Sequence, residues 1–106
     1  MAWIYLIIAG LFEIGWPLGL KLSQTTEHKV MCVIFAVTSM GFSGAFLWLA
    51  QKTIPMGTAY AIWTGIGAVG AFIIGIIMFK DPANILRIVS VLLIVAGIIA
   101  LKLSYS

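Results

Sequence analysis

The chain has 106 residues, of which 63% are hydrophobic and only 8% are charged, and its mean hydropathy is +1.21. A soluble domain typically carries about 25% charged residues, so this composition excludes a soluble monomer and a disordered chain. The net charge of +3 comes from scattered Lys and Arg, which predicts no nucleic-acid partner. The only cysteine, Cys32, excludes an intrachain disulfide. With one histidine and three separated carboxylates, we expect no metal and no cofactor.

Charged and turn residues divide the chain into four apolar runs, which we expect to be helices at about residues 3–21, 30–50, 56–79 and 85–102. Each run is close to the ~20 residues that a helix needs to cross a bilayer. Helix is expected because lipid offers no partner for backbone polar groups. The first run contains Glu13 and lacks a basic N-terminal region, which argues against a signal peptide. We therefore predict an all-α membrane protein, a four-transmembrane-helix bundle in which residues 1–106 form a single domain.

Glu13 lies midway along the first run, near the expected bilayer centre. Inserting an acidic residue there costs about 2.5–3.5 kcal/mol on translocon-based scales. Two roles justify such a residue: a neutral, hydrogen-bonded acid used for helix packing, or a group that binds ions or protons. No other acidic residue lies in an apolar run. We expect the second role, in which Glu13 loses its proton to bind a cation and releases the cation when it is protonated again.

Three neighbours in the first run accompany Glu13. Trp16 lies at i+3 on the same helix face and can make cation–π contact with a bound cation. Gly10 lies at i−3 and leaves room for a close approach. Pro17 has no N–H for the Glu13 carbonyl four residues earlier, so we expect a bend there. Ordinary packing also explains Trp16 and Pro17 when each is taken alone.

The second and third runs contain a hydroxyl and an aromatic pair. A membrane-buried serine usually bonds its own helix, so Ser43 either does this or orients the Glu13 carboxylate. Tyr60 and Trp63 repeat the i, i+3 spacing and place a phenol and an indole on one helix face. Beside a buried glutamate, this pair indicates a shared cation pocket.

Small residues mark helix contacts in the third and fourth runs. Gly65 and Gly67 favour close packing or a kink. Ser90 and Gly97 are seven residues apart in a run without internal charges, which is typical of an assembly helix rather than a helix that carries a site.

The placement of Lys and Arg gives only a weak orientation signal. An even number of helices puts both termini and the second loop on one side, with Lys52 and Lys102. The other side has four basic residues: Lys21, Lys29, Lys80 and Arg87. This bias is compatible with insertion in one direction or in either direction. Because four short helices have little room to enclose a solute path, we expect an oligomer.

Two motifs resemble those of the small multidrug resistance family, and the resemblance covers essentially the whole chain. The segment from Pro55 to Gly67 has the pattern Pro-x-Gly-Thr-Ala-Tyr-Ala-x-Trp-x-Gly-x-Gly, which is highly specific. Phe12-Glu13-x-x-Trp16, followed by Gly-Leu-Lys21, is similar to the family's guanidinium-exporter branch.

The resemblance implies a proton-coupled antiporter of the bacterial inner membrane that works as an antiparallel homodimer with dual topology. Its partners would be protons and a small organic cation, and it would not be an enzyme. Glu13 would bind proton and substrate in competition, supported by Trp16 and Ser43. Tyr60 would gate the path or couple the subunits, and Trp63 would line the pocket. The fourth helix, around Ser90 to Gly97, would form much of the dimer contact.

The expected substrate is guanidinium or a small guanidinyl cation. Guanidinium or a small guanidinyl cation suits a carboxylate, because two N–H groups can bind it side by side. Gly15, Pro17 and Gly19 replace the aliphatic or alanine residues expected in that branch, and they predict a wider pocket. The alternatives are a broader exporter of quaternary ammonium compounds and a non-transporting membrane subunit or assembly factor.

Overall fold

A computed structural model describes residues 1–105 of the chain, with side chains for residues 1–104. Its four helices are joined by short loops: α1 (Ala2–Thr25), α2 (Lys29–Ala50), α3 (Met56–Phe79) and α4 (Ile85–Tyr105). All four helices are long and apolar enough to cross a membrane. The predicted all-α membrane fold is therefore confirmed.

The helix boundaries agree with the predicted ones except at two C-terminal ends. The third helix has the predicted bounds, whereas α1 continues to Thr25 and α4 to Tyr105. In the last turns of α1, the Ser23 hydroxyl donates a hydrogen bond to the Leu20 carbonyl oxygen (2.6 Å). Lys21 and Lys102, the first lysines after the first and fourth apolar runs, therefore lie within helices, whereas α2 and α3 end before Lys52 and Lys80.

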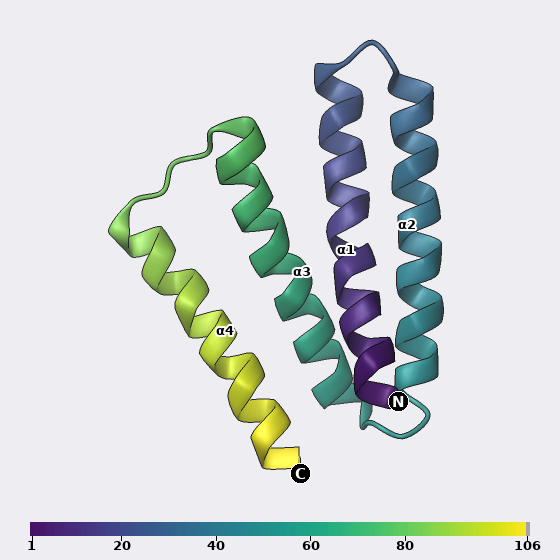
Figure 1. Ribbon diagram of the computed structural model, residues 1–106, viewed down its shortest axis with the longest axis vertical. Helices are drawn as coiled ribbons and strands as arrows, with labels where there is room; N and C mark the ends of the chain where they lie inside the picture. The colour runs from purple at the N-terminus through teal and green to yellow at the C-terminus, as the bar shows by residue number, and fades with distance from the viewer. Residues whose placement is uncertain (106) are drawn as a thin grey trace.

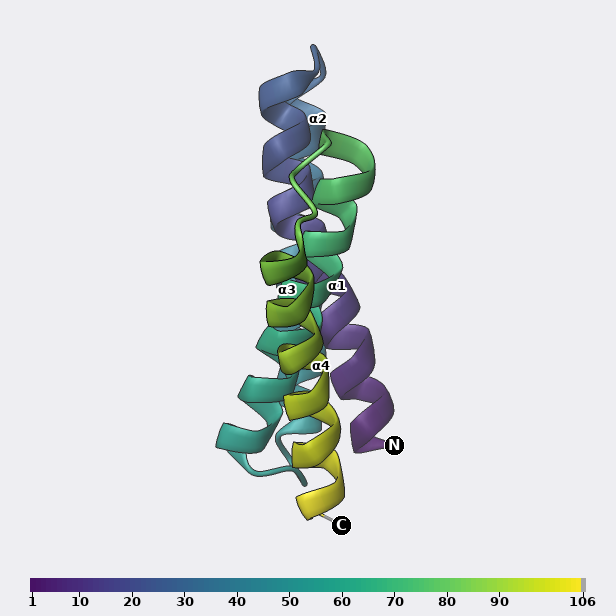
Figure 2. The ribbon, with the colours of Figure 1, turned by 90° about the vertical axis from the view of Figure 1, so that its left-hand side faces the viewer.

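The helices lie side by side in a layer that is one helix thick. In Figure 1 the order across the layer is α4, α3, α1 and α2. The Cα atoms span 46 × 34 × 16 Å, and Figure 2 shows the layer edge-on. Both termini and the α2–α3 loop lie at one end, while the α1–α2 and α3–α4 loops lie at the other. A layer of this kind has two broad faces that no other helix of residues 1–105 covers.

The most completely buried side chains gather at the end that holds the termini. They come from the start of α1, the end of α2, the α2–α3 loop and the start of α3: Leu6, Ala50, Ile54, Ala59 and Ile62. We call this the packed end. The other end, where the α1–α2 and α3–α4 loops lie, is called the open end.

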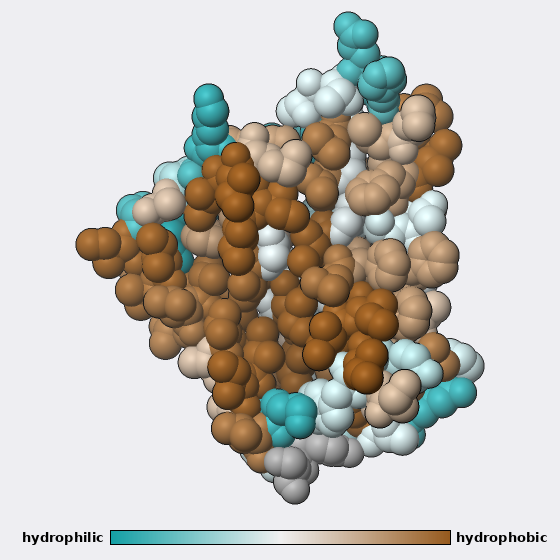
Figure 3. All heavy atoms as spheres, in the orientation of Figure 1, coloured by the Kyte–Doolittle hydropathy of each residue, from teal (hydrophilic) through white to brown (hydrophobic). Residues whose placement is uncertain are grey.

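Polar and apolar residues are distributed as a membrane requires. Figure 3 shows hydrophilic residues at the two ends and a broad apolar band between them. At the packed end, Lys102 lies over the Trp3 ring and Lys52 over the Trp48 ring, each 4.5 Å from the ring centroid. Tryptophan and lysine are typical of the membrane–water interface. The two lysines of this end, Lys52 and Lys102, are the pair predicted to share a side.

Candidate functional site

Glu13 lies in the contact between α1 and α3, and a glycine of α3 makes room for it. A Cβ atom built on Gly67 would lie 2.5 Å from Glu13 Cγ and 3.2 Å from Glu13 Cβ. Any side chain at position 67 would therefore displace the glutamate. Gly67 was expected to allow close packing, and its packing partner is the half-buried side chain of Glu13.

Trp16 holds one oxygen of the Glu13 carboxyl group. Its indole Nε1–H donates a hydrogen bond to Glu13 Oε1 at 2.8 Å. The helix produces this bond, because residues at i and i+3 lie on the same face. Among the described residues, no hydrogen bond to Glu13 Oε2 is formed. The carboxyl group is thus oriented by one donor and keeps an oxygen for a ligand.

A second group of polar side chains joins three helices. The Ser43 hydroxyl of α2, which is only 1% exposed, donates to the Ala9 carbonyl oxygen of α1 at 2.7 Å. The Trp63 indole of α3 donates to Ser43 Oγ at 2.8 Å. Ser43 therefore bonds neither its own helix nor Glu13. Ser43 links Trp63 to the α1 backbone at Ala9, which lies one helical turn before Glu13.

Tyr60 extends this second group toward the surface of the layer. Its ring lies 5.2 Å from the Trp63 ring, with the two planes inclined by 54°. Tyr60 remains 55% exposed. The predicted aromatic face of α3 is present, and Trp63 connects it to Ser43 rather than to Glu13. The two groups lie on adjacent turns: Ala9 is four residues before Glu13, and Trp63 is four before Gly67.

Sequence reasoning identified the side chains of both groups but missed how they connect. The Ala9 carbonyl oxygen accepts the Ser43 hydrogen bond, and no side-chain pattern marks a backbone acceptor. The bond from Trp63 to Ser43 depends on how α2 and α3 meet, which the apolar runs do not specify.

The other glycines of the prediction mediate contacts between helices. Gly10 packs against Ile66 of α3, and a Cβ there would lie 2.7 Å from Ile66 Cγ2. Gly65 packs against Ile98 of α4, with a corresponding distance of 2.8 Å to Cδ1. Within one stretch of α3, Gly65 therefore contacts α4 and Gly67 contacts α1.

The glycines expected to widen the substrate pocket serve a different purpose. A Cβ on Gly15 would lie 2.6 Å from Ser39 Oγ, and one on Gly19 would lie 2.8 Å from the Cys32 carbonyl oxygen. Both positions face α2 and allow it to approach α1 closely. Pro17 faces α3 instead, and α1 continues through it without interruption.

The two residues predicted for the dimer contact lie on the exposed helix α4. The Ser90 hydroxyl donates to the Leu86 carbonyl oxygen of its own helix at 2.8 Å. Gly97 has no atom within 4 Å of a Cβ built on it. Both positions are free to meet another molecule.

The chemistry available at Glu13 is reversible binding of a cation or a proton. Within the described residues, no three His, Cys, Asp or Glu side chains converge to hold a metal ion. Among the described residues, Glu13 is the acidic residue that lies within the four membrane-spanning helices.

Comparison with known proteins identifies the family of the chain. The family model described as Small Multidrug Resistance protein matches residues 1–94. The chain is 53% identical over 104 residues to the Guanidinium exporter of Escherichia coli strain K12, which covers 98% of both chains. It is also 53% identical over 104 residues to the Guanidinium exporter of Salmonella typhimurium, again with 98% of both chains covered.

The same name occurs in a more distant bacterium. The chain is 50% identical over 104 residues to the Guanidinium exporter of Yersinia pseudotuberculosis, with 98% of this chain and 99% of the relative covered. These relatives and the four membrane-spanning helices indicate a multi-pass protein of the bacterial inner membrane. The extent of both matches shows that the chain belongs to the small multidrug resistance family.

Proposed function

We propose that this protein exports guanidinium or small guanidinyl cations in exchange for protons, and that Glu13 binds both in turn. The observation that carries the proposal is the Glu13 carboxyl group, seated on Gly67 with Oε1 bonded to Trp16. The relatives named Guanidinium exporter support the choice of substrate. The protein is therefore proposed to be a transporter rather than an enzyme.

Guanidinium suits this carboxyl group because its N–H groups form a planar fork. A fork of this kind bonds a carboxylate through two parallel hydrogen bonds. Glu13 Oε2 and the remaining lone pairs of Oε1 supply the acceptors. The Trp16 indole N–H bonds the carboxylate and not the cation. The cation can therefore dissociate when Glu13 is protonated.

Proton coupling follows from competition at one carboxyl group. A protonated Glu13 has no negative charge for the cation, and a bound cation disfavours the proton. The other acidic residues, Glu27 and Asp81, lie in the loops and not within the membrane-spanning helices. We therefore expect the KM for guanidinium to rise as the pH falls.

We further propose that two copies pair in antiparallel orientation to complete the path. The layer is one helix thick, so a single copy leaves the Glu13 site open on a broad face. The four-to-two distribution of Lys and Arg between the two ends gives little preference for either orientation. Ser90 and Gly97 lie on α4, and none of the side chains described for this helix is buried in the single chain.

Currents in proteoliposomes test the function directly. Wild-type protein should give a guanidinium-induced current that depends on the proton gradient, and Glu13→Gln should abolish it while leaving a folded protein. Glu27→Gln removes the same charge from a loop and serves as the matched control. If Glu13→Gln retains wild-type exchange, Glu13 is not the coupling group.

The same assay separates the other candidate functions. A tetraalkylammonium cannot donate hydrogen bonds, so its binding would rest on aromatic contacts. Larger currents with a tetraalkylammonium than with guanidinium would favour a broader exporter of quaternary ammonium compounds. No current with any cation, from folded protein, would favour a non-transporting subunit or assembly factor.

The pairing has its own tests. A cysteine at Thr25, in a Cys32→Ser background, should be labelled from both sides of the membrane if both orientations occur. Labelling from one side alone would contradict dual topology. Gly97→Leu should weaken association of the two copies, whereas Gly57→Leu should not, although both positions are open in the single chain.

A further inference from the structure

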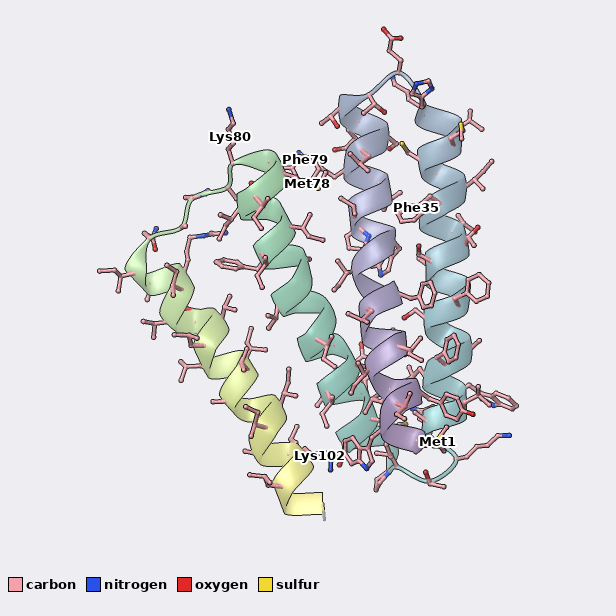
Figure 4. All side chains as sticks on the ribbon, viewed as in Figure 1. Met1, Phe35, Met78, Phe79, Lys80 and Lys102 are labelled. Carbon is pink, nitrogen blue, oxygen red and sulfur yellow. The ribbon has the colours of Figure 1, made fainter. Side chains whose placement is uncertain are left out.

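A cavity of about 270 Å³ lies between α1 and α3 at the open end of the layer. Its walls include apolar, aromatic and charged side chains of both helices and the α3–α4 loop: Ile14, Pro17, Lys21, Gly75, Phe79 and Asp81. Figure 4 shows Phe79 at the upper end of α3, on the side that faces α1. A water molecule occupies about 30 Å³ in the liquid, so this space has room for a small organic cation.

The backbone turns the Asp81 carboxylate toward this cavity. Lys80 ends α3 in the left-handed conformation, with φ 56°, and the Asp81 N–H donates to the Gly75 carbonyl oxygen at 3.0 Å. The side chain then lies against α3, where a Cβ on Gly75 would collide with Asp81 Oδ2. Lys80 itself points away from the helices in Figure 4.

The nearby basic side chains leave this carboxylate unpaired. Arg87 Nε donates to the Pro82 carbonyl oxygen at 2.7 Å, and the guanidinium group lies 5.3 Å from the Phe72 ring centroid. Within residues 1–104, no basic nitrogen lies within 4 Å of a carboxylate oxygen of Asp81. Asp81 is therefore an available negative charge at the mouth of a cavity.

An aromatic ring in the same wall already attracts a cation. The Lys21 ammonium group lies 5.9 Å from the Phe79 ring centroid. A ring face and a carboxylate are the two groups that bind small organic cations. Lys21 is thus a cation of the chain itself that competes for the space and keeps binding weak.

The inner limit of the cavity is next to the proposed transport site. Ile14 lines the cavity, and its side chain packs against Gly70, one turn beyond the seat of Glu13 on Gly67. Pro17, another wall residue, has no N–H for the Glu13 carbonyl oxygen, which leaves a polar atom without its helical partner. The cavity therefore reaches Ile14, the neighbour of Glu13 in the chain.

We propose that this cavity is an outer binding site, where Asp81 and Phe79 hold the exported cation before it reaches Glu13 or after it leaves. The proposal rests on the export function proposed above. Lys21 opposes binding there and speeds release. In an antiparallel pair, one such site would lie at each face of the membrane.

The dependence of current on guanidinium concentration tests the site. An exposed charge pair is worth up to about 1 kcal/mol, so Asp81→Asn should raise KM about two- to fivefold, with little change in maximal current. Glu27→Gln removes the same charge at the same end of the molecule but outside the cavity, and its KM should match wild type. Lys21→Met should lower KM, and Phe79→Leu should raise it.

A binding measurement separates this site from Glu13. In Glu13→Gln protein, guanidinium should shift the backbone amide resonances of Lys80 and Asp81 in a saturable manner, and adding Asp81→Asn should remove the saturation. If wild-type protein gives no guanidinium current, export itself is wrong. If wild-type protein transports while Asp81→Asn, Phe79→Leu and Glu27→Gln share its KM, the outer site is wrong.

Discussion

The two ends of the α1–α3 pair differ in the side chains that line them. At the packed end, Leu6 is 0% exposed and Ile62 only 3% exposed, and a cavity of about 260 Å³ toward α4 is lined by apolar side chains together with Lys102. At the open end, the cavity of about 270 Å³ is lined by Pro17 and by the charged side chains of Lys21 and Asp81. Glu13 lies between these ends. One pair of helices therefore combines an apolar end and a charged end, with the Glu13 carboxyl group at the boundary.

The boundary is built from glycines that admit large neighbours. Gly67 seats Glu13 and Gly70 seats Ile14, so the contact between the ends depends on residues without side chains. The packed end instead uses ordinary apolar burial, which is worth about 25 cal/mol per Å² of buried apolar surface. Substitutions at the boundary should therefore affect transport, whereas substitutions at the packed end should affect stability.

The largest expected effect is at the boundary. Gly67→Val places a side chain where Glu13 Cγ lies, so the carboxyl group must move away from Trp16. Each 1.4 kcal/mol of lost binding is a factor of ten, and we expect guanidinium current to fall on the order of tenfold or more. Gly57→Val is the control, because nothing lies within 4 Å of a Cβ at that position. Equal currents from both variants would show that Gly67 does not seat the site.

A leucine pair in α1 compares the two ends directly. Leu6→Ala removes a fully buried side chain, and truncating such a leucine costs about 2–5 kcal/mol of unfolding free energy. Leu18 is half-buried beside the cavity, so Leu18→Ala should cost about 1 kcal/mol or less. Unfolding in mixed detergent micelles, followed by circular dichroism, measures both. Similar losses would mean that the two ends are equally well packed.

The sequence predicted the helices and the chemistry of the site better than the contacts between helices. Apolar length alone identifies a membrane-spanning helix, and the i, i+3 spacing places Trp16 beside Glu13. The runs are apolar nearly all round, so periodicity cannot indicate which face of α1 meets α2. For that reason the sequence pattern predicts a wider pocket at Gly15 and Gly19, whereas both glycines pack against α2.

The link between Trp63 and Ser43 should have a smaller effect than a buried leucine. Trp63→Phe keeps most of the ring but removes the donor to Ser43 Oγ, and a hydrogen bond contributes about 0.5–1.5 kcal/mol. Trp48→Phe is the matched control, because Trp48 is 63% exposed. The unfolding free energy should fall more for Trp63→Phe than for Trp48→Phe. A loss that is the same for both variants would assign the effect to ring size.

The smallest expected effect compares two lysines that lie over aromatic rings at opposite ends. Lys102 is 4.5 Å from the Trp3 ring centroid at the packed end, and Lys21 is 5.9 Å from the Phe79 ring centroid at the open end. An exposed cation–π contact contributes about 0.5–1 kcal/mol, tryptophan is the strongest partner, and the attraction weakens with distance. Lys102→Met should therefore destabilise the protein by about 0.5 kcal/mol, and Lys21→Met by less.

Methionine keeps the length of the lysine stem in both variants, so packing changes little and the charge is what is removed. The same unfolding measurement ranks the two. The transport assay should rank them in the reverse order, because Lys21 lines the cavity and Lys102 lies at the far end from it. Lys21→Met should change the KM for guanidinium while Lys102→Met leaves it unaltered. If Lys102→Met changes KM and Lys21→Met does not, cation access depends on the packed end, and the assignment of the two ends must be exchanged.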